Sequence, residues 1–211
     1  MSKRITFLLL ILSVSLVQFS CKTRTTRGAM KHGEVLKTNL ESFEKNRVKL
    51  STGLVSSLEE AKEQLTQENP DIPEVSKDFE KEWRSIMSRY NKLKNDYESI
   101  GNSSTAYFEE LNGLSNNINN EELRNSELQK NKELEGRWQK TFTTAGESIN
   151  KITTVLEAGN DFHMVLVASS IRQKLEQNVD ELNNMAEQAK VLLSDLEIFT
   201  QAGKDLVAGE G

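Results

Sequence analysis

Residues 79–118 read FEKEWRSIMSRYNKLKNDYESIGNSSTAYFEELNGLSNNI. Within this stretch, large side chains recur every three or four residues, which is the spacing of one face of an α-helix. The positions on that face are Phe79, Trp83, Ile86, Tyr90, Leu93, Tyr97, Ile100, Ser104, Tyr107, Leu111, Leu114 and Ile118. A repeat sustained over this length predicts a helix over residues 74–116 that packs as in a coiled coil.

The segment before this helix contains both prolines of the chain, Pro70 and Pro73. A residue that precedes proline is pushed out of helical geometry, and Asp71 can cap the start of the next helix. The spacing before this turn predicts a first amphipathic helix over residues 34–68, with its apolar face interrupted at Arg47. The apolar positions of that helix are Leu36, Leu40, Phe43, Leu50, Leu54, Leu58, Ala61 and Leu65.

Asparagines crowd the stretch after the central helix, which favours a turn at 115–121 with Asn120 as the cap of the next helix. One apolar register then runs through Leu134, Trp138, Phe142, Ala145, Ile149, Ile152 and Leu156. A later register runs through Ala168, Ile171, Leu175, Asn178, Leu182, Met185, Ala189, Leu192, Leu196 and Phe199. The two do not join by a plain heptad, so we predict a tight turn from Gly159 to Asp161; a stutter in one long helix is the alternative.

These registers predict an all-α fold, an elongated antiparallel helical bundle over residues 34–203. Four helices are favoured, because an unbroken last helix would be about twice as long as the others at ~1.5 Å per residue. Such a bundle would be a monomer, with a flexible tail over 204–211. The alternative is a three-helix hairpin whose long last helix forms a coiled-coil dimer through the seam from Ile171 to Phe199.

The first residues have the composition of a bacterial secretory signal. Lys3 and Arg4 precede an apolar run over residues 5–17, which is too short to span a hydrocarbon core of ~30 Å. Ser20 and Cys21 resemble the lipobox of bacterial lipoproteins, in which the cysteine is acylated and becomes the new N-terminus, although Gln18 departs from the usual leucine. We expect a signal peptide over 1–20 and a lipid on Cys21; a free cysteine is the alternative.

A lipidated basic tether is expected over residues 21–33. Lys22, Arg24, Arg27 and Lys31 lie in it without any acidic residue. Near an anionic membrane these side chains would add a second attachment, whereas the alternative is a passive spacer. From residue 34 onward the chain has 21 basic against 32 acidic side chains, so nucleic acid is not an expected partner.

The residue after the cysteine also bears on localisation. Lys22 is not the aspartate that marks inner-membrane retention in the better-known lipoprotein sorting systems. We therefore predict an outer-membrane protein that faces the periplasm, with the cell surface and the inner membrane as alternatives.

Residues with catalytic or metal-binding chemistry are scattered. The two histidines, His32 and His163, are far apart in the sequence, and neither lies in a cluster with metal-ligand spacing. Adjacent carboxylates such as Glu59 and Glu60 diverge around a helix and would not converge as an acid and a base. We expect no catalytic activity, no cofactor and no metal.

Several segments resemble a family of bacterial helical envelope proteins that is known as a domain of unknown function. They are the run from Tyr90 to Tyr97, the pair Arg137 and Trp138, residues 155–158 with Asp161, and the apolar residues 164–166. The resemblance covers roughly residues 56–200 and implies an elongated helical protein at the cell envelope. Gly159 and Asn160 depart from the pattern of the family.

Together these features predict a lipid-anchored helical bundle with a structural or protein-interaction role and a protein partner of unknown identity. The alternative is a carrier in which the apolar run from Met164 to Ala168 lines a slot for a lipid or another apolar ligand.

Overall fold

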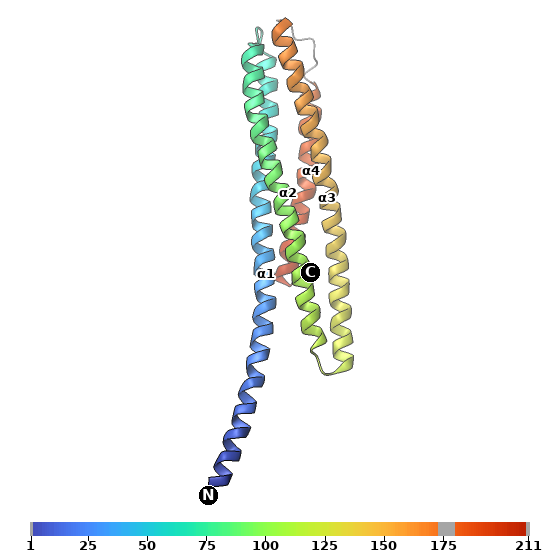
Figure 1. Ribbon diagram of the computed structural model, residues 1–211. Helices are drawn as coiled ribbons and strands as arrows, with labels where there is room; N and C mark the ends of the chain where they lie inside the picture. The colour runs from blue at the N-terminus through green and yellow to red at the C-terminus, as the bar shows by residue number, and fades with distance from the viewer. Residues whose placement is uncertain (1, 173–179, 210–211) are drawn as a thin grey trace.

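The computed structural model describes residues 2–172 and 180–209, and for residues 2–29 it describes the backbone alone. All regular structure in these residues is helical (Figure 1). The helices are α1 (Ser2–Leu65), α2 (Ile72–Asn116), α3 (Glu121–Arg172) and α4 (Asp180–Ala208). The prediction of an all-α bundle of four helices is confirmed.

The helices pack in a closed ring, in which α1 contacts α2, α2 contacts α3, α3 contacts α4 and α4 contacts α1. Successive helices run in opposite directions along one long axis, and α1 extends past the α2–α3 hairpin (Figure 1). Because α4 packs between α1 and α3, the three-helix alternative with a protruding arm is wrong. The described part of the seam that a coiled-coil dimer would use is largely buried inside the bundle.

Both predicted hairpins are confirmed, together with their helix caps. The Asp71 side chain accepts a hydrogen bond from the Glu74 backbone N–H at 3.2 Å, just before the first turn of α2. Asn120 accepts one from the Leu123 N–H at 3.0 Å and so caps α3. Each cap satisfies a backbone donor that a helix start would otherwise leave without a partner.

The helix break expected from Gly159 to Asp161 is wrong, because α3 continues to Arg172 and the chain reverses between Arg172 and Asp180. Gly159 is buried under Trp83, and a β-carbon at residue 159 would lie 1.8 Å from Cζ2 of that ring. The glycine therefore permits a close helix contact and does not end the helix. The buried face continues beyond it through Phe162, Leu166 and Ser169.

Two predicted boundaries are also wrong. α1 begins at Ser2 and not near residue 34, since a helix that packing holds from Leu36 onward extends readily into adjacent residues. α4 continues to Ala208, and the chain does not leave the bundle at residue 204. Gly203 packs against Leu40, and Leu206 is only 3% exposed, so the last turns of α4 have a core of their own.

An aromatic cluster joins all four helices. The Phe199 ring of α4 lies 5.3 Å from Phe43 of α1 and 5.4 Å from Trp138 of α3, measured between ring centroids. Tyr97 of α2 lies 6.0 Å from the same ring. Such contacts combine apolar burial with favourable ring geometry, so this cluster is a main packing centre of the bundle.

Most predicted seam positions lie in the core. On α2 the buried members of the predicted face are Phe79, Trp83, Ile86, Tyr90, Leu93, Ile100 and Ser104. Two predictions are wrong: Ile171 is 79% exposed, and α4 buries Leu193 where Leu192 was expected. On α3 the buried face runs through Leu166 and Ser169, which turns Ile171 to the surface, whereas on α4 either leucine fits a spacing of three or four residues and packing selects Leu193.

Candidate functional site

The residues predicted to attach the protein to a membrane lie near the N-terminal end of α1. Lys31 is exposed there. The side chains of Cys21, Lys22, Arg24 and Arg27 lie outside the described residues. Acylation of Cys21 and contact between the basic side chains and lipid therefore stay predictions.

Three aromatic side chains of α2 donate hydrogen bonds to backbone carbonyls of α3, at steps of one heptad along both helices. The pairs are Trp83 Nε1 to Leu156 at 3.2 Å, Tyr90 Oη to Ile149 at 3.2 Å, and Tyr97 Oη to Phe142 at 2.8 Å. A buried donor that loses its acceptor carries a desolvation cost, so a shift of one helix along the other would be penalised at all three places. This ladder fixes the position of α3.

A buried arginine fixes α4 against α1. Arg47 is 7% exposed and donates from Nε and Nη2 to the two carboxylate oxygens of Glu44, both at 2.8 Å. Its Nη1 donates to the Leu193 carbonyl at 3.1 Å, and Nη2 lies 3.4 Å from Glu197. The hydrogen bond from Arg47 lowers the pKa of Glu44, against the opposite effect of burial.

Held in this way, α3 and α4 leave a surface groove along their shared seam, which we call the α3/α4 groove. It consists of three successive hollows of about 240, 490 and 480 Å³. On α3 its lining includes Arg137, Lys140, Thr141, Thr144, Lys151 and Thr154. On α4 it includes Glu187, Val191, Leu192, Asp195, Ile198 and Asp205.

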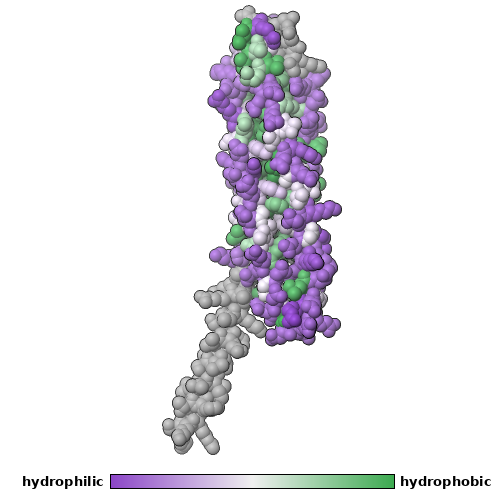
Figure 2. Space-filling model, turned by 45° about the vertical axis from the view of Figure 1, so that its right-hand side comes forward, coloured by the Kyte–Doolittle hydropathy of each residue, from purple (hydrophilic) through white to green (hydrophobic). Residues whose placement is uncertain are grey.

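The floor of the groove is weakly polar. Val191 and Ile198, one heptad apart on α4, are 62% and 66% exposed. The hydroxyls of Thr141 and Thr144 donate to the carbonyls four residues earlier in α3, at 3.2 and 3.1 Å. A hydroxyl bound to its own helix leaves the methyl group as the part of the side chain free for contacts. The groove thus offers apolar contacts on a molecule whose visible surface is mostly hydrophilic (Figure 2).

The rims of the groove carry opposite charges. Each hollow has a basic residue on α3 and an acidic residue on α4: Arg137 with Asp205, Lys140 with Asp195, and Lys151 with Glu187. No ion pair joins the two rims among the residues that the structure describes. Asp195 accepts a hydrogen bond from Ser148, and Glu187 pairs with Lys190 of its own helix.

One buried donor lies at the end of the groove nearest the α2–α3 hairpin. Trp138 is 5% exposed, lines the first hollow, and has no hydrogen-bond partner for Nε1 within the described part of the chain. Its ring stacks near Phe199, with the two centroids 5.4 Å apart. Packing therefore holds the indole in place.

The residues that could bind a metal ion or an apolar ligand do not form a common site. Residues 2–172 and 180–209 contain no group of three or more His, Cys, Asp or Glu side chains that could hold a metal ion. His163 lies near the Phe79 ring, with the centroids 6.5 Å apart. The run from Met164 to Ala168, proposed to line a ligand slot, does not form one continuous lining. Met164 is 64% exposed, whereas Leu166 is fully buried.

Sequence reasoning missed the groove and the role of Arg47. Arg47 was visible as the one charged residue at a seam position, with Glu44 three residues before it. Val191 and Ile198 were visible as apolar residues one heptad apart outside the predicted seam. The arrangement of charges on the two rims needed the structure, because it depends on how α3 and α4 align.

Comparisons with family models, curated proteins and solved structures give no match. No described helix has a stretch that is both long and apolar enough to cross a bilayer.

Proposed function

We propose that this protein is a lipid-anchored helical bundle of the cell envelope, attached through Cys21, with a structural or protein-interaction role and no catalytic activity. The proposed location is the outer membrane, facing the periplasm. The basic residues Lys22, Arg24, Arg27 and Lys31 would lie next to the membrane and add to the attachment.

The observation that carries this proposal is how the buried polar groups are used. Arg47, Trp83 and Tyr90 each bind a backbone carbonyl of a neighbouring helix. These groups hold the helices in register, which is an architectural role. The α3/α4 groove is left as an exposed, weakly polar surface suited to another protein.

The position of the groove agrees with such a role. Near its two ends, Leu40 of α1 packs against Gly203, and Lys62 of α1 donates to Asn183 at 2.9 Å. At ~1.5 Å per helical residue, these levels lie roughly 30 and 60 Å from Cys21 along α1. A bundle anchored at Cys21 would hold the groove well clear of lipid headgroups.

Attachment is tested by mass spectrometry of the N-terminal peptide from cells that express the full chain. We expect an acylated Cys21 as the first residue, in the outer-membrane fraction. The Cys21→Ser variant should accumulate with residues 1–20 still present. An unmodified cysteine in the wild-type protein would rule out the anchor.

The interaction role is tested separately from the anchor. Native mass spectrometry of protein released without detergent should find no apolar small molecule, and crosslinking in the envelope should capture protein through the α3/α4 groove. A bound lipid at one copy per chain would instead support the carrier.

A further inference from the structure

We propose that two copies of this chain pair in parallel through the α3/α4 groove, with α3 of each copy lying against α4 of the other. This goes beyond the proposed interaction role by naming the partner and the orientation. It also replaces the monomer expected from the sequence. The pairing itself needs only the folded bundle, so it does not depend on the lipid.

Symmetry and charge determine the relative orientation of the two copies. Face-to-face pairing of identical surfaces requires a two-fold axis in the plane of contact. A two-fold axis parallel to the groove places α3 of one copy opposite α4 of the other, so the basic rim on α3 faces the acidic rim on α4 of the partner. A two-fold axis perpendicular to the groove places α3 opposite α3, so the two basic rims face each other. Only the parallel arrangement is electrostatically favourable.

The positions of the charges along the groove also favour the parallel arrangement. Lys151 and Glu187 line one hollow, and Arg137 and Asp205 line another, so opposite charges occur at matched levels. Rotation about an axis along the groove preserves the level of every residue. Each basic side chain therefore meets the acid of its own level on the other copy, and every such contact occurs twice.

The apolar floor supplies the contact between these rims. Val191 and Ile198 are largely exposed in one bundle and would be covered by α3 of the other, whose Thr141 and Thr144 present methyl groups. Charged pairs at a solvent-exposed rim contribute little affinity but choose the orientation. Two copies that both hold the proposed lipid anchor would stand on one membrane with their grooves at the same height, which raises their effective concentration.

Cysteine crosslinking in cells that express the full chain tests the pairing and its direction. Thr141→Cys and Thr154→Cys lie near opposite ends of the groove, about 20 Å apart along α3 at ~1.5 Å per residue. In the parallel pair each variant should form a dimer with itself under mild oxidation or with a short bis-maleimide. In an antiparallel pair neither would, and only a mixture of the two would crosslink.

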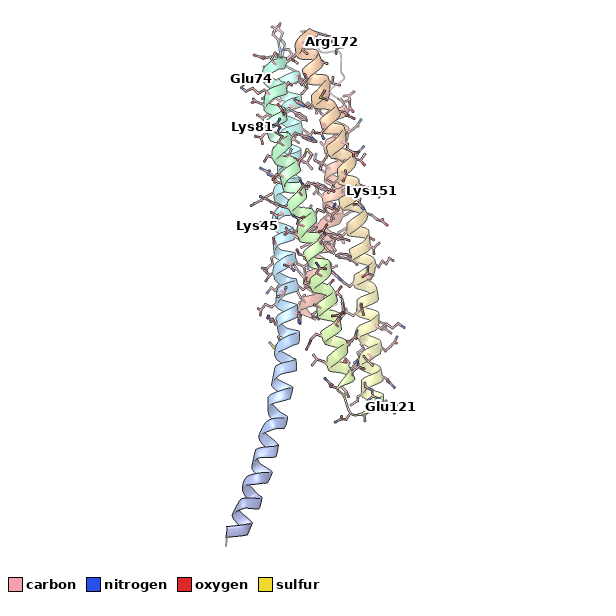
Figure 3. The ribbon with its side chains drawn as sticks, viewed as in Figure 1. Lys45, Glu74, Lys81, Glu121, Lys151 and Arg172 are labelled. Carbon is pink, nitrogen blue, oxygen red and sulfur yellow. The ribbon has the colours of Figure 1, made fainter. Side chains whose placement is uncertain are left out.

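Two controls separate this result from other sources of dimer. Lys45→Cys places a thiol on the exposed surface of α1, which does not contact α3 (Figure 3). It should not crosslink. The chain without an added cysteine should also stay monomeric on the gel, and a dimer in that lane would reveal a free Cys21. That outcome would contradict the lipid anchor. The groove pairing would then be measured by the dimer yield of Thr141→Cys and Thr154→Cys above the yield of the chain without an added cysteine.

Charge reversal tests the rims. Lys151→Glu in the Thr154→Cys background should lower the dimer yield by about tenfold, because two acidic rims then face each other. Glu187→Lys should have a similar effect, and the two changes together should restore the yield. Lys45→Glu, with the same change in net charge, should have no effect. Absence of self-crosslinks at both groove positions, or adducts whose mass is not twice that of the chain, would overturn the proposal.

Discussion

The ring of Trp83 lies directly on the backbone of Gly159, so close that a β-carbon on that glycine would fall 1.8 Å from Cζ2. The same ring donates its N–H to the Leu156 carbonyl, one turn earlier in α3. A glycine in the middle of a long helix thus marks a place where a large side chain of α2 packs directly on the backbone of α3.

Replacing this glycine should therefore destabilise the bundle although alanine favours helices. Gly159→Ala forces the Trp83 ring away from α3, and overpacking of this kind should reduce the free energy of unfolding by about 2 kcal/mol. Gly136→Ala is the matched control, since an added β-carbon there would have no contact within 4 Å beyond the adjacent backbone of its own helix. It should raise stability by about 0.5–1 kcal/mol. Urea unfolding followed by helical circular dichroism measures both, and equal effects would contradict the packing role of Gly159.

Acid should weaken the contact between α1 and α4 through Glu44. The hydrogen bond from Arg47 lowers the pKa of Glu44 in the folded protein. A carboxyl group with a depressed pKa contributes stability above its unfolded value of about 4.3, and this contribution is lost as pH falls through the folded value. Glu44→Gln should flatten that part of the stability profile. Glu41→Gln, exposed on the same helix, should leave the profile as in the wild type.

Alkali should weaken the bundle through two tyrosines. Burial raises the pKa of Tyr97 and of Tyr107, so each holds its proton in the folded state after the unfolded chain has begun to lose it, at a pH of about 10. Stability then falls as pH rises above that value.

Phenylalanine substitutions distinguish the two residues. Tyr97→Phe also removes the hydrogen bond to the Phe142 carbonyl and should cost about 1 kcal/mol at neutral pH. Tyr107 makes no hydrogen bond through its hydroxyl within the described chain, so Tyr107→Phe should cost little there. Thermal unfolding from pH 7 to above 10 measures both effects; an alkaline loss unchanged in both variants would exclude these tyrosines as its cause.

The basic segment before the bundle should bind anionic lipid even without acylation. A chain that starts at Lys22 should associate with phosphatidylglycerol vesicles at low salt, since each basic side chain near the surface contributes about 1 kcal/mol. Binding should fall as salt rises, because the Debye length shortens to ~8 Å at 0.15 M. A chain that starts at Glu34 is the control. Equal binding by the two chains would identify residues 22–33 as a passive spacer.

Much of the bundle could be predicted from local patterns. The periodic residues from Phe79 to Ile100 and the caps at Asp71 and Asn120 placed α2 and both of its turns, because those features depend on neighbours within a few residues. The number of helices followed from their lengths, because an unbroken last helix would be about twice as long as the others.

The features that local patterns did not predict depend on contacts between residues far apart in the sequence. Gly159 and Ser169 are core positions without large apolar side chains, so the register through them was invisible to hydrophobic periodicity. Glycine is common where helices end, which favours a break at Gly159, yet here this glycine accommodates Trp83. The α3/α4 groove depends on the lateral alignment of two helices, which no repeat in the sequence specifies.

The contact between Arg47 and Leu193 spans 146 residues of chain, and this separation has a kinetic consequence. Contacts between successive helices, including those between α3 and α4, grow outward from short connections, and such local contacts form quickly. The contact of α4 with α1 joins segments far apart in the chain, and closing a long loop costs more entropy than closing a short one. The α1–α4 contact is thus expected to form last during folding and to open first in the native state, so the backbone amides of α4 should exchange with deuterated water at a lower free energy of opening than those of α2.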